Sequence, residues 1–455
     1  MAARPNRIDA AGRRAFKVPG RDADHGTMAA PGGTMRVART LGLSVLTLAL
    51  LIGLLPAPVT AAPARYAGGD AGSGLPPVPL QRETSAARRV AVEWSDVTDR
   101  HAWAREAIDH VAGSRDWMRD YAPKPDGTVP FKPSRLEPRR LFARAMVRAF
   151  APDAMPDPGV LFTDLDPSSK FWRFASVAVS KGWMTRSPDG SFRPDDAVTT
   201  TQVHRALVLA VGLRPAAKAL NAIRYADGSR VPVPGHFGTT VMGMRLNLRY
   251  PSKYEDNDVL PTTPLSRSQV AYSLWKASVQ TDSTIRYLLD QHRSVVLPNM
   301  GPARRQIVEW GVRYVGYPYV WAGEWGLDSP APSALGGQSI PGFDCSGLAW
   351  WVMRRNDSYA WQVAPPRPYR GWSLPERSSA TMAGATTSKV RYADLKPGDL
   401  MFYASGSAVD HVDVYVGNGW ALDSSTSVAG VTLMWVGDDS WYQRSFVHGR
   451  RLLAN

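Results

Sequence analysis

Cysteine is almost absent from this sequence: Cys345 is the only one among 455 residues. A single thiol cannot form a disulfide within its own chain, so the fold has no internal cross-link. The sequence also lacks a Lys/Arg block, a nucleic-acid-binding motif, a metal-binding constellation and a nucleotide-binding loop. We therefore predict no nucleic-acid partner, no metal and no cofactor. The formal net charge of +14 is spread along the chain, which suits either an anionic polymer surface or simple solubility.

A hydrophobic run long enough to stay in a membrane is lacking near the N-terminus. The apolar run at 41–55 is about 15 residues long, whereas a membrane-spanning helix needs roughly 20. Basic residues precede it and small residues follow it, which is the order of a secretory signal. We predict a leader and signal at 1–61, cleaved just after Ala61 or Ala62, with no stable membrane span afterwards. An uncleaved anchor is the alternative.

The first 34 residues are polar, basic and without pattern. They form an extended leader, or the true start is Met28 or Met35. Export would place Cys345 in an oxidising environment, where a free thiol is a liability. Buried filler is one explanation for such a thiol, and a catalytic role is the other.

A pattern repeats along residues 91–280, after a flexible linker rich in Ala, Gly and Pro at 62–90. The first copy contains "PDGTVPFKPSRL" and ends in "RRLFARAMVRAF", and the second contains "PDGSFRPDDAV" and ends in "TTQVHRALVLAV". Each copy is predicted to be a helix, a glycine-containing loop and a second helix, because apolar residues recur at three- and four-residue spacing. A third, weaker copy ends in "PLSRSQVAYSLWKAS".

These copies resemble S-layer homology repeats, which usually come in threes and hold exported proteins on cell-wall polymers. The resemblance implies an anionic cell-wall polymer as a partner. In that family the second helix opens with a Thr-Arg-Ala-Glu-like tetrad, whose Arg lies at the polymer-binding groove. We align the tetrad with residues 137–140, 199–202 and 266–269, so that only Arg267 keeps the Arg. A helical spacer without a ligand is the alternative.

The thiol belongs to the last unit, 301–455, which follows a predicted linker at 281–300. Cys345 lies in "FDCSG", just before an apolar run that is predicted to form a helix. A thiol at a helix N-terminus meets exposed N–H groups and the positive end of the helix dipole, and both favour the nucleophilic thiolate. Asp344 is predicted to cap the same helix.

A thiolate nucleophile needs a base, and only His411 and His448 follow the cysteine. His411 begins "HVDVYVGNGW", which is predicted to be a strand that enters a hairpin at 417–419. Strand alternation puts three valines on one face and His411, Asp413 and Tyr415 on the other. A cysteine at a helix start facing a histidine at a strand start is the papain-like arrangement for acyl transfer. His448, in a basic strand end, is the competing base.

Five motifs in this unit resemble, in order, those of the NlpC-type cell-wall peptidases: "YPYVWAG", "FDCSG", "LPERSS", "LKPGDLMFY" and "DHVDVYVGNGWALDSS". These papain-like cysteine peptidases cleave peptidoglycan stem peptides, often between D-glutamate and diaminopimelate. The resemblance implies an α+β domain with an antiparallel sheet. The whole chain is thus predicted to be multidomain, with all-α S-layer-homology-like repeats before the papain-like domain.

Carried over by position, the resemblance makes Cys345 the nucleophile and His411 the base. It places Tyr319 in the nucleophile's pocket, and Asp344 and Ser346 at the amino end of the stem peptide. The residue that orients the base is commonly His in this family, sometimes Asn or Gln, and here it is Asp423.

Two further departures are Ala322-Gly323, where Gly-Gly is usual, and the longer loop "EWGLDSPAPSALGGQSIPG". A three-residue hairpin loop at 417–419 would put Asp423 on the face of His411. A two-residue loop would instead turn Asp423 to the valine face, because a one-residue slip reverses every side chain. A solvent-exposed Asp423 without a catalytic role is the alternative.

The sequence thus predicts a secreted, wall-associated hydrolase, a cysteine peptidase that cuts peptidoglycan stem peptides and is held at the wall by its repeats. A non-catalytic wall-binding protein is the rival from another class. An amidase or transpeptidase that uses the same thiol is the rival among enzymes.

Overall fold

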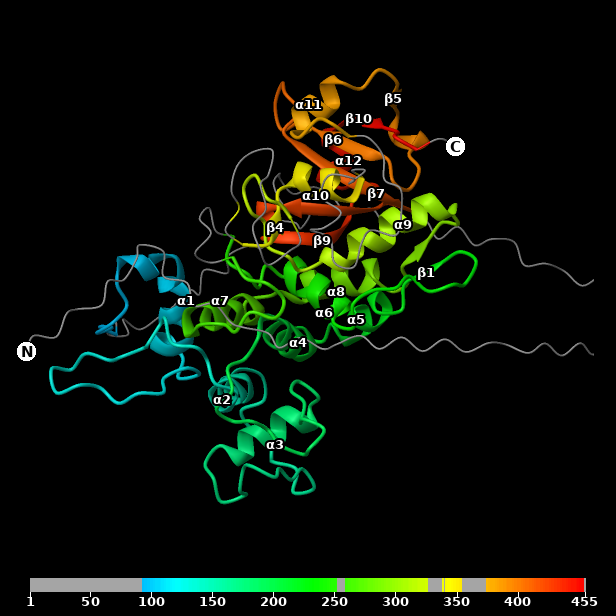
Figure 1. Cartoon of the computed structure of the whole chain (residues 1–455). Helices are drawn as coiled ribbons and strands as arrows, with labels where there is room; N and C mark the ends of the chain where they lie inside the picture. The colour runs from blue at the N-terminus through cyan, green and yellow to red at the C-terminus, as the bar shows by residue number, and fades with distance from the viewer. Residues whose placement is uncertain (1–91, 252–257, 326–337, 339, 354–373, 454–455) are drawn as a thin grey trace, which may run out of the picture. The chain divides into compact units, whose positions relative to one another are not determined.

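The computed structural model describes residues 92–251, 258–325, 338, 340–353 and 374–453. The predicted leader, signal and first linker lie outside the described residues. Within the described residues, no helix combines the length and the apolar character needed to cross a membrane. Figure 1 shows helices through the first part of the described chain and a sheet built from its last part.

The helices of the predicted repeats form where the apolar spacing places them. Helix α2 (Arg139–Phe150), for example, buries Phe142, Ala145 and Met146 at helical spacing. The described elements of this part are η1 (Asp99–Ala104), α1 (Arg105–Ile108), η2 (Asp109–Ser114), α2, α3 (Trp172–Ser180), α4 (Thr200–Ala210), α5 (Arg214–Leu220), α6 (Phe237–Arg245) and α7 (Arg267–Ser278).

Matched residues of the first two copies make matched contacts. The carboxylate of Asp96 accepts the backbone N–H groups of Phe131 and Lys132, at 2.8 and 2.9 Å. The carboxylate of Asp164 accepts those of Phe192 and Arg193, both at 2.7 Å. The residue after each phenylalanine has a positive φ, 62° and 57°. The first two copies therefore repeat in structure as well as in sequence.

The second helices of the three copies start side by side. Isolated antiparallel bridges join Leu136 to Ser266, Pro138 to Ala197 and Thr199 to Pro264. Each bridge lies just before α2, α4 or α7, so the three helix starts close a ring of backbone contacts.

The tetrad alignment of the first copy is wrong by one residue. Pro138, Thr199 and Ser266 are the N-caps of α2, α4 and α7, so the first helical residues are Arg139, Thr200 and Arg267. Arg139 therefore occupies the position of Arg267, and two copies keep the arginine. The sequence alignment failed because proline, which has no side-chain hydrogen-bond acceptor, replaces the usual capping residue.

Residues 281–300, predicted to be a linker, contain regular structure instead. Thr281 caps α8 (Asp282–Gln291) by accepting the backbone N–H of Thr284, and the helix buries Leu288. Strand β2 (Val296–Leu297) then pairs in parallel with β1 (Arg224–Tyr225). The helical part of the chain is therefore not purely α-helical, because it includes this short pair.

The C-terminal part contains a six-stranded antiparallel sheet in the order β5-β10-β6-β7-β8-β9. An antiparallel sheet with helices agrees with the predicted α+β class. Its strands are β5 (Lys389–Val390), β6 (Leu400–Tyr403), β7 (His411–Gly417), β8 (Trp420–Ser425), β9 (Gly430–Trp435) and β10 (Phe446–Arg450). The other elements are α9 (Pro302–Gly311), η4 (Val312–Tyr314), β3 (Glu324–Trp325), β4 (Gly342–Phe343), α10 (Cys345–Met353), α11 (Ser379–Gly384), η6 (Tyr392–Asp394), η7 (Thr426–Val428) and α12 (Trp441–Ser445).

The hairpin between β7 and β8 has a two-residue turn and a bulge. Gly417 pairs with Trp420, so only Asn418 and Gly419 turn, both with positive φ. The register shifts between Tyr415 and Gly417, which gives β7 one extra residue. This bulge cancels the slip expected of a two-residue loop and leaves Val414 opposite Leu422. In that register Asp413 and Asp423 face each other, as a three-residue loop was predicted to place them.

The two faces of the sheet bury different clusters. Val412, Val414 and Val416 are buried in the main core, which also contains apolar residues of α9 and α10. The other face buries Met401, Tyr403, Ala421 and Met434, together with Tyr442 of α12 and Met244 of α6. His411 and Asp413, which alternate with these valines, therefore lie on the face that buries this second apolar cluster.

Candidate active site

The thiol lies at the first residue of α10, as the sequence predicted. Cys345 is a free cysteine of intermediate exposure. The Asp344 carboxylate accepts the backbone N–H of Gly347 and the Ser346 hydroxyl, the latter at 3.0 Å, and so caps the helix. A side chain at Gly347 would collide with the carbonyl of Gly323, so the helix start packs closely on that loop. These contacts hold the first turn of α10, which carries Cys345, in place against the loop at Gly323.

Arg377, in the motif "LPERSS", holds the residues on both sides of the thiol. Its guanidinium forms ion pairs with Glu324 and with Asp344, the latter at 3.2 Å, and donates to the Ser346 hydroxyl at 2.9 Å. Burial opposes the charge, but the two carboxylates raise the pKa of Arg377 overall. Asp344 and Ser346 are themselves almost fully buried. The sequence analysis assigned no role to Arg377, although its motif had been recognised.

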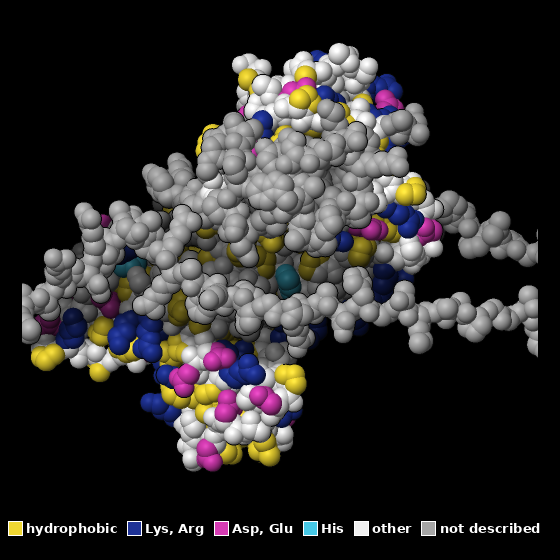
Figure 2. All heavy atoms as spheres, in the orientation of Figure 1, with side chains coloured by type: hydrophobic (Ala, Val, Ile, Leu, Met, Phe, Trp, Pro, Cys, Tyr) yellow, Lys and Arg dark blue, Asp and Glu magenta, His cyan; other side chains and the backbone are white. Residues whose placement is uncertain are grey.

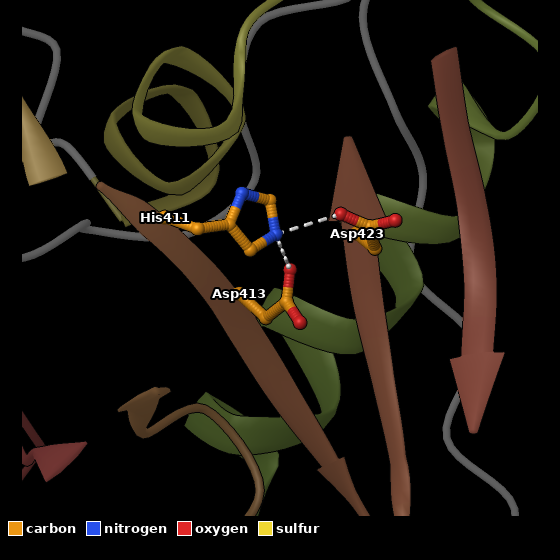
Figure 3. Close-up of side chains that lie close together, drawn as sticks. All are labelled: His411, Asp413 and Asp423. Carbon is orange, nitrogen blue, oxygen red and sulfur yellow. Dashed lines mark hydrogen bonds and ion pairs between the residues drawn. The ribbon is translucent and has the colours of Figure 1, made fainter. Parts of the chain in front are cut away.

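The predicted base and the predicted orienting residue lie together, as Figure 3 shows. His411 begins β7, and its Nε2 is 3.0 Å from Asp423 Oδ1 of β8. A hydrogen bond between His411 and the Cys345 side chain is among the contacts that raise the pKa of the imidazole. Because Nε2 faces the carboxylates, Nδ1 is the ring nitrogen left for the thiol. Cys345 and Asp423 therefore both act on the His411 ring.

Asp413 is a second carboxylate at the same ring nitrogen, and the sequence analysis gave it no role. Its Oδ1 is also 3.0 Å from His411 Nε2, and both aspartates are 1% exposed or less. The signal that could have found it was the His-Val-Asp spacing, which puts His411 and Asp413 on the same face of a strand. Two buried carboxylates therefore converge on one imidazole proton.

The crowding of charge shifts the titration of these groups. Burial, and then repulsion by Asp423, raise the pKa of Asp413 to about 7, against the opposing effect of His411. Burial disfavours the imidazolium, but Asp413, Asp423 and the thiol outweigh it and raise the pKa of His411 well above its ordinary value. The imidazolium is therefore favoured at neutral pH.

Two tyrosines complete the surroundings of the carboxylates. The Tyr442 hydroxyl donates to Asp423 Oδ2 at 3.3 Å, and the Ser425 hydroxyl donates to the same oxygen at 2.8 Å. Tyr403 is fully buried opposite His411 in the β6–β7 ladder. Burial, followed by the negative charge of the aspartates, raises the pKa of both tyrosines, so they remain protonated.

Tyr319 lies near the thiol, whereas His448, the competing base, lies on another strand. Tyr319 bridges to Phe343, two residues before the thiol, and burial together with the charge of Cys345 raises its pKa. It therefore lies near Cys345. His448 lies on β10 with its ring tilted against that of Phe402, and burial lowers its pKa. Neither the thiol nor a carboxylate is among the causes of that shift, unlike the shift of His411.

The departure from the family pattern at Ala322 keeps the backbone conformation of a glycine. Its φ is 59°, a left-handed conformation that glycine adopts at no cost and alanine adopts with strain. The loop geometry that usually requires a glycine is therefore kept, although the residue has changed.

His411, Asp413 and Asp423 also have the donor types of a metal site, with the donor atoms within 4.8 Å of one another. In the described structure Nε2 of the ring faces both carboxylates. A nucleophile at a helix start, a base beside it and carboxylates behind the base can together perform acyl transfer.

Comparison with known families gives two matches along the chain. Residues 316–450 match the model of the NlpC/P60 family, and residues 161–199 match that of the S-layer homology domain. The resemblance predicted from the motifs is confirmed for both segments, with the S-layer homology match in the second copy.

Individual relatives match over the same C-terminal part. A "Probable endopeptidase" of Mycobacterium tuberculosis is 34% identical over 127 residues, which is 28% of this chain and 24% of its own length. A "Probable endopeptidase p60" of Listeria welshimeri is 36% identical over 89 residues, 20% of this chain and 14% of its own. The solved peptidoglycan hydrolase RipB of Mycobacterium tuberculosis is 27% identical, with a TM-score of 0.24, and the match covers 34% of this chain and 66% of that one. The chain spans about a fifth to a quarter of the length of the first curated relatives it matches.

Proposed function

We propose that this chain, with an NlpC/P60 domain after an S-layer homology domain, is an exported hydrolase that cleaves peptidoglycan stem peptides. The bond would be of the D-glutamyl–diaminopimelate type, and the enzyme a cysteine peptidase. The observation that carries the proposal is the single thiol at the start of α10, together with a histidine whose pKa the thiol helps to raise and two buried carboxylates behind that histidine. The relatives named endopeptidases support the same activity.

In the first step the Cys345 thiolate attacks the carbonyl carbon of the scissile amide. The new C–S bond forms, and the carbonyl oxygen becomes an oxyanion beside the backbone N–H groups at the start of α10. As the C–N bond breaks, the Nδ1 proton of His411 passes to the leaving amine. Asp423 and Asp413 stabilise the imidazolium that supplies this proton and hold the ring orientation through Nε2.

In the second step water attacks the carbonyl of the thioester. His411, now neutral at Nδ1, takes the proton from the water, and the thiolate leaves as the C–S bond breaks. The product carboxylate departs, and the thiolate–imidazolium pair is restored. No other reactant is required.

The substrate contacts are assigned to Tyr319, Asp344 and Ser346. Tyr319 borders the thiol, and Asp344 carries a carboxylate suited to the free amine of a stem peptide. Because Arg377 already pairs with Asp344 and Ser346, the amine would share that carboxylate with the guanidinium. A stem peptide with a blocked amine should therefore bind less well.

The helical part is proposed to hold the enzyme at the wall through an anionic polymer. The protein is accordingly proposed to be secreted and wall-associated. The S-layer homology match at 161–199 supports this role. On the face drawn in Figure 2, basic and acidic side chains are interspersed over the part that Figure 1 labels α2 and α3. A mixed surface of this kind favours a specific anion site over a uniform basic patch.

Product analysis of digested peptidoglycan tests the proposal. Mass spectrometry of the soluble fragments should show stems cut after D-glutamate and new free amines on diaminopimelate. Whole stems released from the glycan would identify an amidase, and newly joined stems a transpeptidase. Protein that pellets with the wall without releasing fragments would identify a non-catalytic binder. His448→Ala is the matched histidine control, because its product pattern should equal that of the parent.

A further inference from the structure

One carboxylate oxygen of the cluster formed by His411, Asp413 and Asp423 lacks a hydrogen bond. His411 Nε2 lies 3.0 Å from Oδ1 of each aspartate. A single N–H cannot point at both oxygens, and the geometry of a hydrogen bond is met with Asp413. Within the described residues, Asp423 Oδ1 has no hydrogen-bond partner, although Asp423 is completely buried and Figure 3 shows this oxygen directed at the ring. The proton of one imidazole therefore does not satisfy both carboxylates.

Repulsion between the two carboxylates favours a cation between them. Asp413 and Asp423 are 1% and 0% exposed, and the donor atoms of the cluster lie within 4.8 Å of one another. Like charges this close in a buried site repel strongly, because little water screens them. A divalent cation at this point would attract both carboxylates with twice the charge of an imidazolium. It can also be bound by several donors at once, which a proton cannot.

The strands already hold the three donors at separations that suit a metal ion. His411 and Asp413 lie on one face of β7, and Asp423 faces Asp413 from β8. Two ligands at about 2.1 Å from a zinc ion are about 3.0 Å apart when they meet it near a right angle. An imidazole nitrogen with two carboxylates suits a transition-metal dication, whereas Mg²⁺ prefers oxygen donors alone. The sequence showed no such constellation, because the third donor comes from the neighbouring strand.

The groups around Asp423 leave its Oδ1 to the cluster. The hydroxyls of Ser425 and Tyr442 both donate to Asp423 Oδ2, at 2.8 and 3.3 Å. In metal sites, such hydrogen bonds to a ligating carboxylate orient it toward the metal. The His411 side chain is 15% exposed, so the cluster is not closed to solvent on every side. The surroundings of Asp423 therefore resemble those of a metal ligand.

We propose that His411, Asp413 and Asp423 bind one divalent transition-metal cation of the Zn²⁺ type, which takes the place of the proton on Nε2. On binding, the imidazolium releases this proton to solvent, and the Nε2 lone pair and one oxygen of each carboxylate coordinate the cation. The Nδ1 proton stays on the ring. The consequence for cleavage rests on the proposed function: donation of the Nδ1 proton would now leave an imidazolate instead of a neutral imidazole. The bound cation should therefore inhibit the enzyme reversibly.

Isothermal titration of the full chain with ZnCl₂, after removal of metals with EDTA, tests the site. The parent should bind one Zn²⁺ tightly, and MgCl₂ should give no measurable binding. Asp413→Asn and Asp423→Asn should each weaken Zn²⁺ about a hundredfold or more, since even residues that only support a ligand typically contribute about 10- to 100-fold. Asp410→Asn removes an exposed carboxylate next to His411 and should leave the affinity unchanged. Equal affinity in all four proteins would overturn the proposal.

Cys345→Ser separates this site from a thiolate site. Its Zn²⁺ affinity should equal that of the parent, and Zn²⁺ should raise its melting temperature, because a ligand of the folded state stabilises that state. Loss of Zn²⁺ binding in Cys345→Ser would show that the thiol is the ligand and would overturn the proposal, even where an asparagine variant fails to fold.

In the parent, Zn²⁺ should inhibit stem-peptide cleavage, and EDTA should restore it. Zn²⁺ binding is measured without substrate, so the two proposals can fail separately. An inactive parent that binds Zn²⁺ in the expected pattern would support the metal site and refute only the proposed hydrolysis. An active parent that binds no Zn²⁺ would refute only the metal site.

Discussion

In the helical part, the buried Arg267 guanidinium lies between the carboxylates of Glu137 and Asp120, at 2.6 and 2.7 Å. In the C-terminal part, the His411 imidazole lies between Asp413 and Asp423, both at 3.0 Å. The charges are arranged alike, but the Arg267 side chain is completely buried, whereas the His411 side chain is partly exposed. His411 can release its proton, and it contacts a thiol. The same electrostatic pattern therefore serves packing in one region and, in the proposed mechanism, proton transfer in the other.

The largest loss of cleavage rate should follow from substituting Cys345 or His411. Cys345→Ser and His411→Ala should each lower the rate of stem-peptide cleavage by about a thousandfold or more, because the nucleophile or its base is lost. The melting temperature of Cys345→Ser should stay near that of the parent, whereas His411→Ala leaves Asp413 and Asp423 without their cation and should melt at a lower temperature. Full activity in the Cys345→Ser enzyme would rule out thiolate catalysis.

Removing the Arg267 guanidinium should lower the free energy of unfolding and leave the rate of stem-peptide cleavage unchanged. Arg267→Met leaves the buried Glu137 carboxylate without its ion-pair partner, although Arg144 still pairs with Asp120, and should cost about 3–5 kcal/mol of unfolding free energy, measured by urea denaturation. Burial already raises the pKa of Glu137 despite Arg267. Without Arg267 the carboxyl folds only as the neutral acid, so the loss should grow as the pH rises. Arg139→Met removes bonds to carbonyls alone and is the milder control; an equal loss in both would contradict the ion-pair explanation.

Changing the carboxylate on β8 should shift the pH dependence. Asp423→Asn keeps the shape but removes a charge that raises the pKa of His411, so the imidazolium is lost at lower pH. The alkaline limb of the rate profile should therefore move to lower pH, with measurable activity kept. Asp423→Ala should lose more, because the orienting contact to Nε2 disappears as well. An Asp423→Ala enzyme with the parent's rate and pH profile would remove Asp423 from the site.

Sequence reasoning reached the parts of this site that depend on local pattern. The position of Cys345 before an apolar helix and the alternation of His411 with the valines follow from spacing alone. The turn between β7 and β8 was predicted less well, because a bulge next to Gly417 is a property of strand pairing. The role of Arg377 was missed because its partners come from other segments of the chain. Asp413 was missed although its partner His411 is only two residues away on the same strand face. Arg139 was misaligned because a proline replaces the usual helix cap.

The pKa of His411 tests most directly whether the two carboxylates around this imidazole stabilise its charged form. A titration of the histidine side chains by ¹⁵N NMR, with the His411→Ala spectrum for assignment, would measure it in the parent, in Asp413→Asn and in Asp423→Asn. The parent should hold the imidazolium well above pH 6.5, and each substitution should lower that pKa. In Asp413→Asn the titration should also become simpler, because one of the two coupled carboxyl groups is gone. A His411 that titrates near 6.5 in all three proteins would contradict the account.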